Sequence, residues 1–333
     1  MKAVNFTGKY LDVVDQRGLP YEEIWLRCKN LEDIAQAMEL GLIRGYSTLV
    51  ISSLYALKME LQNSPSVSWK DFKKVWVLAK KRVQKAIPSD EKLLELLEVF
   101  ECAIQQSKSL SLKDIELHLD KVIYDFQDSL WIKPLEICKH SRKVLTKNPC
   151  SILTWAPPTT YSEMSLALVE ILKCFREGHN IKKVYLGRHP EIGLGSLFTL
   201  ELQRSDVPFE SLSYSEIANE MQSGNIDYLL LAAESVAGNG DVVAEHGAYT
   251  LAILAHHHGI DLWLVATRDH LQENCHSGEV IVKGFTSEHQ KAVDIIPSNL
   301  ISGYITELGV IKAPFAGAVQ GKSQKKRKTK KAC

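Results

Sequence analysis

The hydrophobic positions near the N-terminus change from a short-period pattern to a helical one at about residue 30. Val4-Asn5-Phe6 and Tyr10-Leu11-Asp12-Val13-Val14 flank the short turn Thr7-Gly8-Lys9, which predicts a β hairpin. From residue 31 the apolar residues recur at helical spacing, and Asn30 is placed to cap the first helix. The stripe consists of Leu31, Ile34, Ala37, Met38, Leu40 and Leu42. Further helices are predicted near 69–86, 90–107 and 111–146, the last capped by Ser109 or Ser111.

From residue 150 the pattern changes, because short apolar runs now alternate with helical stretches. Strands are predicted at 151–155, 183–186, 208–212, 227–231 and 261–266. Helices are predicted between them, near 161–177, 195–204, 215–222 and 246–258. Strands that alternate with helices at this spacing are typical of βαβ units and a parallel sheet.

These patterns together predict an α/β fold with two domains. Residues 1–147 form a small helical N-terminal domain with a β hairpin, and residues 148–318 form a Rossmann-like parallel α/β domain. Residues 319–333 form a disordered basic tail, because they contain little to bury. We find no internal repeat.

The composition is ordinary for a soluble globular protein, with 45% hydrophobic and 24% charged residues. No apolar run reaches the roughly 18 residues that span a bilayer, and the N-terminus lacks the apolar core of a secretory signal. The seven cysteines are scattered, odd in number and without CxxC spacing. This favours reduced thiols in a cytoplasmic protein, with no disulfide framework and no zinc or other metal site.

The net charge of zero hides an asymmetry. Seven Lys and Arg residues lie among the last twelve residues, which leaves 33 basic against 40 acidic residues in the rest of the chain. An acidic body makes specific binding of nucleic acid unexpected. The tail is a solubilising end, or, if the source is eukaryotic, a nuclear-import or polyanion-binding segment.

The glycine-rich stretch 232–251 holds the strongest candidate chemistry. It follows the apolar strand Tyr228-Leu229-Leu230-Leu231 and leads into an apolar helix, with Asn239-Gly240-Asp241 as a tight turn between them. Alpha/beta proteins place their ligands where a strand, a tight loop and a helix follow one another. We therefore expect the functional site at this end of the sheet.

This stretch resembles the signature of the methylthioribose-1-phosphate isomerases. That family shares its fold with ribose-1,5-bisphosphate isomerases and with the regulatory subunits of translation initiation factor 2B. Other matching segments lie in the same order along residues 3–315, namely Asp15-Gln16-Arg17…Leu19-Pro20, Arg44-Gly45, 151–158 and 294–311. The resemblance implies a Rossmann-like domain, a homodimer built mainly through the larger domain, a sugar-phosphate ligand and no cofactor.

The reactive positions depart from the family pattern. Ala156 stands where the family has a cysteine against the reacting sugar carbon, and Trp155 replaces a histidine. Alanine has no heteroatom and acts neither as acid nor as base. Cys150 lies six strand residues away, roughly 20 Å at about 3.3 Å each, and cannot replace it. Glu234 takes the place of the catalytic aspartate, either as a misplaced acid/base or as a solvated or capping group.

The positions that bind phosphate in the family are also changed. Arg44 and Gly45 are kept, as an anion contact or a structural ion pair, but Tyr46 and Ser47 replace an alanine and a proline. Ala244-Glu245 stands where the family has Asn-Lys, which reverses the local charge towards a phosphate. Gly193 aligns with a family glutamine, and Ile87-Pro88 replaces an arginine before proline.

The run His256-His257-His258-Gly259 suggests a metal site only at first sight. Consecutive helical side chains point about 100° apart and do not converge on one ion. The run instead predicts a helix C-terminus with Gly259 just beyond it.

Three functions are consistent with this sequence. The first is a diverged, inactive or weakly active isomerase homologue that persists as a binding or assembly protein. The second is a working isomerase of methionine salvage, or a sister enzyme of altered substrate, with Glu234 as acid/base and Arg44 on the phosphate. The third is a regulatory protein similar to the initiation factor 2B subunits, with protein partners.

Overall fold

The computed structural model describes residues 3–18, 22–43, 46–63, 69–86, 91–106, 111–155, 163–178, 180–188, 196–272, 274–283 and 293–312. The chain divides into two compact units, and the division falls between Ile132 and Lys133, inside a helix. The predicted α/β class with a small helical unit and a parallel-sheet unit is confirmed. Residues 133–147 pack with the second unit.

The first unit begins with a small antiparallel sheet of three strands in the order β1-β2-β3. Its strands are β1 (Val4–Phe6), β2 (Leu11–Val14) and β3 (Trp25–Cys28). The predicted hairpin is present, with Val4 opposite Val13. The strand β3 was not predicted, because Trp25 and Arg27 are exposed and only Cys28 is buried.

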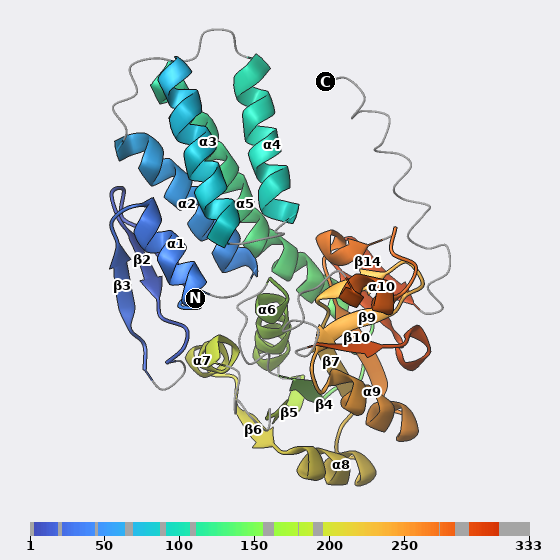
Figure 1. Cartoon of the computed structure of the whole chain (residues 1–333). Helices are drawn as coiled ribbons and strands as arrows, with labels where there is room; N and C mark the ends of the chain where they lie inside the picture. Colours follow the sequence, from blue (N-terminus) through green and yellow to red (C-terminus); the bar gives the residue numbers. More distant parts are fainter. Residues whose placement is uncertain are drawn as a thin grey trace. The chain divides into compact units, whose positions relative to one another are not determined.

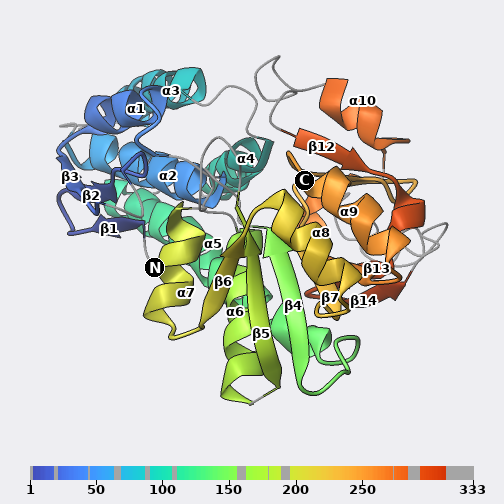
Figure 2. The same ribbon diagram turned by 90° about the horizontal axis from the view of Figure 1, so that it is seen from below.

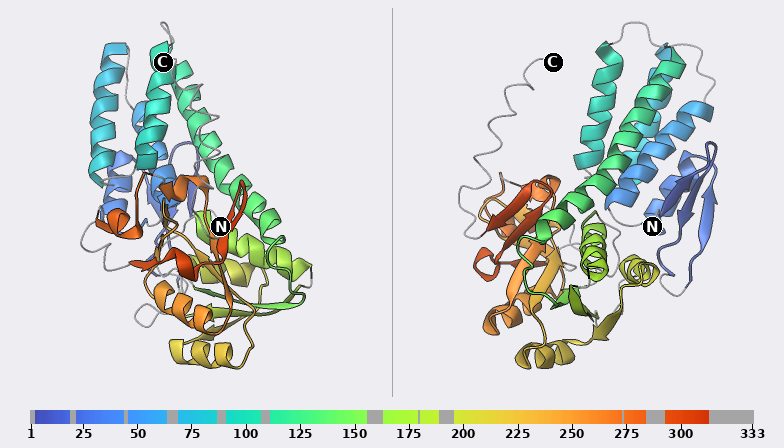
Figure 3. Two further views of the ribbon diagram at one scale, coloured as in Figure 1. Left: turned by 90° about the vertical axis from the view of Figure 1, so that its right-hand side faces the viewer. Right: turned by 180° about the vertical axis from the view of Figure 1, so that it is seen from behind.

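Helices make up the rest of the first unit, where they lie close to one another (Figures 1 and 3). They are α1 (Leu31–Glu39), α2 (Tyr46–Asn63), α3 (Trp69–Ala86), α4 (Glu91–Gln106) and, as far as Ile132, α5 (Leu112–Ser141). Asn30 caps α1 as predicted, since its side chain accepts the Asp33 N–H at 2.9 Å. Ser111 accepts the Asp114 N–H at 3.3 Å and caps α5.

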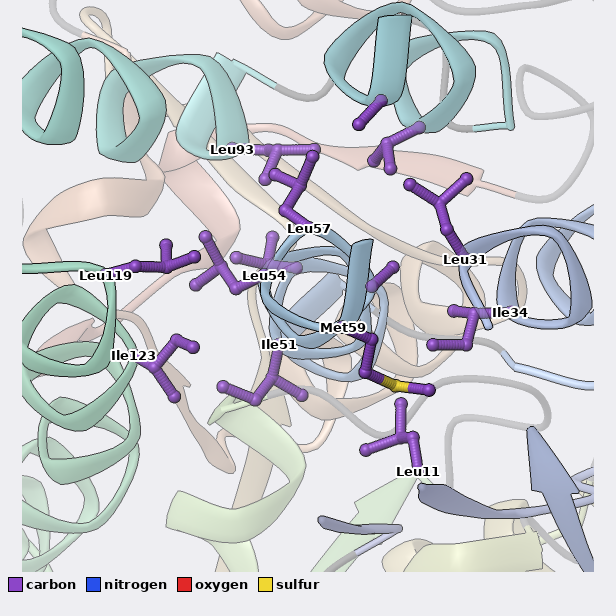
Figure 4. Close-up of a cluster of buried hydrophobic side chains, with 14 of the residues drawn as sticks. Leu11, Leu31, Ile34, Ile51, Leu54, Leu57, Met59, Leu93, Leu119 and Ile123 are labelled. Atoms are coloured by element: carbon purple, nitrogen blue, oxygen red, sulfur yellow. The ribbon is translucent and has the colours of Figure 1, made fainter. Parts of the chain in front are cut away.

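The core of the first unit forms around α2. Leu54 and Leu57 are fully buried there, and Figure 4 shows leucines and isoleucines of α1, α4 and α5 around this helix. Small residues on α2 let its neighbours approach, which suits a helix buried on several faces.

The second unit contains a sheet of seven strands in the order β14-β13-β10-β7-β4-β5-β6. Five of them were predicted and are β4 (Cys150–Trp155), β5 (Ile181–Gly187), β6 (Phe209–Leu212), β7 (Tyr228–Ala232) and β10 (Asp261–Val265). These five pair in parallel and are joined by β13 (Gly303–Thr306), while β14 (Gly309–Lys312) is antiparallel to β13. Apolar side chains on both faces account for the uninterrupted hydrophobic runs.

Helices cover both faces of this sheet (Figure 1). On one face lie α6 (Glu163–Glu177) and α7 (Ser196–Arg204), and on the other α8 (Tyr214–Gln222) and α9 (Ala248–His257). The strands β4, β5 and β6 run side by side in the view from below (Figure 2). All four helices lie where the sequence predicted them.

A smaller sheet of four strands follows the main one, in the order β11-β8-β9-β12. It contains β11 (Leu271–Gln272), β8 (Ser235–Ala237), β9 (Val242–Glu245) and β12 (Val293–Ile296), next to α10 (Gly278–Lys283). The predicted tight turn Asn239-Gly240-Asp241 is present, but the expectation that a tight loop alone leads from β7 into α9 was wrong. A hairpin forms instead, because Val236 and Val242 pair across the predicted turn Asn239-Gly240-Asp241.

Candidate functional site

The order of the strands places the candidate site. The chain moves from β4 outward through β5 and β6, then returns to place β7 on the other side of β4. Ligands of open parallel sheets bind at the carboxyl ends of the strands, at this point of reversal. Trp155 ends β4 there, and Glu234 follows β7.

Trp155 fills the space at the reversal point. Its side chain is only 3% exposed, and its ring lies 5.0 Å from that of Tyr214, centroid to centroid. A Cβ added to Gly187 would lie 2.2 Å from the indole, and one added to Gly247 would lie 2.9 Å from it. The ring therefore packs directly against two glycine backbones, at the end of β5 and at the start of α9.

The start of α9 is capped from within the chain. Gly247 adopts φ +97°, and its N–H donates to Oδ2 of Asp294 at 2.7 Å. The Tyr249 N–H donates to the same oxygen at 3.0 Å, and His246 Nδ1 lies 3.0 Å from the other carboxylate oxygen. A carboxylate thus takes the position where a helix N-terminus can bind an anion.

Glu234 is half-buried at the carboxyl edge of the sheet. Its N–H donates to the Val243 carbonyl at 2.8 Å, which ties the residue to β9. Its carboxylate is close enough to His270 to act on the charge of that imidazole.

His270 lies just beyond β10, in the short 3-10 helix η1 (Arg268–His270). Its Nδ1 is 2.7 Å from the Thr267 hydroxyl. Burial lowers the pKa of His270 to about 4, so the ring is neutral near pH 7, although the carboxylates of Asp269 and Glu234 partly oppose that shift. Asp269 forms an ion pair with Lys133 at 2.7 Å.

The remaining family-aligned positions are distributed as follows. Arg44, Gly45, Ala156 and Gly193 lie outside the described residues, and Tyr46 is the first residue of α2. Ala244 and Glu245 lie in β9, where Ala244 is buried opposite Asp294. The structure thus brings Trp155 and Glu234 to one edge of one sheet, and the roles of all these residues stay predictions.

Asn239-Gly240-Asp241 has a structural function in this chain. The Asp241 carboxylate accepts the N–H groups of Gly278 at 3.3 Å and Ser298 at 3.2 Å, and the Tyr304 hydroxyl donates to the Gly240 carbonyl. These contacts hold α10 and the 3-10 helix η2 (Ser298–Leu300) to the hairpin turn.

Two other sequence candidates also take structural positions. Cys150 begins β4, at the strand end opposite Trp155, and burial raises its pKa to about 11. The three histidines end α9 as predicted, with Gly259 at φ +68° just beyond. Among the described residues no group of His, Cys, Asp and Glu is arranged to hold a metal ion.

The sequence reasoning missed Tyr214, His270 and Asp294. A signal for His270 was available, because the polar run Thr267-Arg268-Asp269-His270 directly follows a predicted apolar strand. Asp294 was noted only as the start of a matching segment, and its role at the start of α9 could not have been found, because its partners Gly247 and Tyr249 lie 47 and 45 residues earlier in the chain.

Comparison with known proteins agrees with this architecture. The model of the initiation factor 2 subunit family matches residues 42–313. Methylthioribose-1-phosphate isomerase of Stutzerimonas stutzeri is 26% identical, over 98% of this chain and 97% of its own length. The corresponding protein of Caldicellulosiruptor saccharolyticus is 27% identical, over 95% of this chain and 97% of its own length.

Solved structures show the same fold. The 5-methylthioribose 1-phosphate isomerase of Pyrococcus horikoshii superposes with a TM-score of 0.85 at 20% identity, covering 96% of this chain and 94% of its own. The delta subunit of translation initiation factor eIF-2B from A. fulgidus superposes with a TM-score of 0.78 at 18% identity, covering 95% and 97%. In the described part of the chain, no helix is long and apolar enough to cross a membrane.

Proposed function

The chain belongs to the initiation factor 2 subunit family, and on that premise we propose that it is a diverged relative of the methylthioribose-1-phosphate isomerases. It is inactive or only weakly active in the isomerisation of methylthioribose 1-phosphate and acts as a binding or assembly protein, although its similarity to these enzymes extends over nearly the whole chain. The observation that supports this most directly is the buried Trp155 ring at the reversal point of the sheet.

The reason is one of space. A substrate at the reversal point needs room between the ends of β4 and β5 and the start of α9. In this chain the indole is in contact with Gly187, Gly247 and the Tyr214 ring there. An imidazole, which the family resemblance implies at this position, is smaller and leaves part of that space open.

The charge of the neighbouring hairpin supports the same proposal. Ala244-Glu245 supplies a carboxylate where the resemblance implies a lysine. One unit charge at 4 Å from a phosphate contributes about 1 kcal/mol in water and about 4 kcal/mol at an effective dielectric of 20. Reversing its sign therefore disfavours a sugar phosphate at this edge.

The test is calorimetry with methylthioribose 1-phosphate and ribose phosphates, followed by a product assay on the same samples. We expect no turnover of any aldose 1-phosphate. Binding without turnover would indicate a sugar-phosphate sensor, and the absence of binding would indicate a role with protein partners. Turnover of about 1 s⁻¹ or faster on methylthioribose 1-phosphate would reject the proposal. The double variant Trp155→His/Ala156→Cys tests whether these two residues cause the absence of turnover. Trp25→His, at an exposed position of β3, is the matched control.

A second candidate function is a sugar-phosphate isomerase with Glu234 as acid/base. It is favoured by the place of Glu234, two residues after the end of β7 at the carboxyl edge of the sheet. This candidate requires that Glu234→Gln abolish turnover of the phosphorylated substrate.

A third candidate is a regulatory role with protein partners, favoured by the similarity to an eIF-2B subunit over 95% of the chain. Co-purification of a defined hetero-oligomer from the native source would support it, and a homodimer without partner would count against it. The homodimer through the larger unit and the cytoplasmic location are part of our proposal. Size-exclusion chromatography with light scattering tests the first of these.

A further inference from the structure

Two helices of the first unit, α3 and α4, leave apolar side chains in contact with solvent. Leu78 is 69% exposed and Val99 is 55% exposed, and Val77 and Leu94 are exposed as well. Single exposed apolar residues are ordinary on a protein surface, but a group of them on neighbouring helices is typical of a surface that binds another molecule.

The two helices are neighbours and run in opposite directions. The Trp76 ring of α3 lies 4.8 Å from the Phe100 ring of α4, centroid to centroid, and Lys80 Nζ lies 2.8 Å from Glu101 Oε1. Only four residues separate the end of α3 from the start of α4, which makes the pair antiparallel (Figure 1).

The exposed residues of both helices lie on one side of this pair. Each residue advances about 100° around a helix, so Leu78 is turned about 160° from Lys80, which contacts α4. Val99 is turned about 160° in the same sense from Glu101, which contacts α3. In antiparallel helices the same sense of rotation leads to the same side. We call this side of α3 and α4 the outer face.

The outer face is basic on one helix and acidic on the other. The α3 sequence contains seven Lys and Arg residues against one Asp, and the α4 sequence contains four Glu residues against one Lys. Lys74, Lys81 and Lys85 are exposed on α3, and Glu98 is exposed on α4. Apolar and oppositely charged groups therefore lie on the same surface.

We propose that the outer face binds the outer face of a second copy of this chain, around a two-fold axis parallel to α3 and α4. Such an axis keeps the height along the helices and places α3 of each copy over α4 of the other. Leu78 then meets Val99 of the second copy, because the two residues differ in height by about 1.5 Å relative to the Trp76–Phe100 contact. Lys81 faces Glu98 of the second copy.

The distribution of charge selects this partner and this orientation. A two-fold axis across the helices would stack α3 on α3 and bring lysines against lysines, which is repulsive. A wholly basic face would fit an acidic partner, whereas a face that is half basic and half acidic complements itself under rotation. Every charge contact in this arrangement occurs twice.

This contact is separate from a homodimer through the larger unit, and it does not depend on whether the chain isomerises a sugar phosphate. A chain that makes both contacts forms assemblies larger than a dimer. The two proposals can therefore fail independently, and a product assay on the same preparations tests the loss of turnover.

The first experiment is sedimentation velocity of the full chain over a concentration series, with wild type and Leu78→Asp. We expect Leu78→Asp to weaken one step of self-association about 10-fold or more, because it places a charge in an apolar contact that occurs twice. Leu308→Asp is the matched control, since Leu308 is 54% exposed at the turn between β13 and β14 in the second unit.

The second experiment exchanges the charges. Lys81→Glu and Glu98→Lys should each weaken the same step about 10-fold, because each variant meets like charges in its own copies. An equimolar mixture of the two variants should associate as wild type does, since both contacts then join opposite charges. Lys283→Glu, at the exposed end of α10, is the control for a changed net charge.

Thermal melts establish that each variant is folded. A wild-type chain that stays monomeric up to about 100 μM overturns the inference, as does association that is unchanged in folded Leu78→Asp. A mixture of Lys81→Glu and Glu98→Lys that associates no better than either variant alone also overturns it. The outer face would then serve a different protein or an anionic surface.

Discussion

The two ends of the central parallel strands differ in what their side chains do. At the amino end, the Asp227 carboxylate accepts the Ser151 N–H at 2.7 Å and pairs with Lys147 at 2.9 Å. The Tyr228 hydroxyl accepts two further backbone N–H groups there, at 3.0 Å each. The carboxyl end instead gathers an indole, a carboxylate and a neutral imidazole.

The difference teaches where change is tolerated. Groups at the amino end satisfy backbone donors, so their replacement costs stability without affecting a ligand. Groups at the carboxyl end lie where ligands bind, so their replacement alters chemistry while the sheet persists. Between the two ends the buried strand positions are mostly apolar, as in Leu229, Leu230 and Leu231 of β7.

Among the variants that test this difference between the two ends, Trp155→Ala is expected to change the free energy of unfolding most. Removing a buried indole leaves a cavity, and the loss in free energy of unfolding is expected to be about 3–5 kcal/mol. Urea unfolding measures it, with Trp25→Ala on β3 as the exposed control. A loss below about 1 kcal/mol would mean that the indole is not packed as described.

The next effect is a pH dependence that originates at His270. Its pKa is about 4 in the folded chain against about 6.5 unfolded, so the unfolded chain takes up a proton first as pH falls. The neutral His270 ring makes its full contribution to the free energy of unfolding above pH 6.5. That contribution is lost as the pH falls towards 4, by up to about 3 kcal/mol.

His270→Asn removes this titration. The difference in unfolding free energy between wild type and His270→Asn, measured from pH 7 to pH 4, should therefore shrink by that amount. A difference that stays constant with pH would show that the ring titrates normally in the folded chain.

A smaller effect is expected from Gly187→Ala. The added Cβ would lie 2.2 Å from the indole, and such overpacking costs about 1–3 kcal/mol. The same change in a Trp155→Ala background should cost much less, because the clashing atoms are gone. Additive losses in the double variant would place the strain elsewhere.

The smallest effect belongs to the amino end. Asp227→Ala leaves the Ser151 N–H without its acceptor and should cost about 1–2 kcal/mol. Ligand binding at the carboxyl edge should not change, since that edge lies at the other end of the strands. A change in ligand binding without a loss of stability would contradict the division between the two ends.

Most elements of the fold could be predicted from the sequence, because apolar runs such as that of β7 are long and bounded by polar residues. The short strands of the smaller sheet could not, since Ser235–Ala237 and Val242–Glu245 are only three and four residues long and flank a turn that was expected to lie between a strand and a helix. Their formation depends on β12, some 50 residues later, and no local pattern reports it.

The site was predicted only in part. Glu234 and Trp155 were identified from a resemblance to known motifs, and the order of the strands then places both at one edge. His270 acquires its properties from burial and from Thr267, which are tertiary effects. Residue type alone does not indicate whether an imidazole is neutral.

Helix α5 belongs to two cores, and this has a consequence for how the protein can be divided. Its first part buries Ile115 and Leu119 in the helical unit, and its last part buries Ile137 and Cys138 beneath the parallel sheet. A fragment that starts at residue 148 would lack part of its own interior. Recombination between relatives at that point would give a poorly packed chimera, so exchange of modules in this family is best made inside the helix, near Ile132.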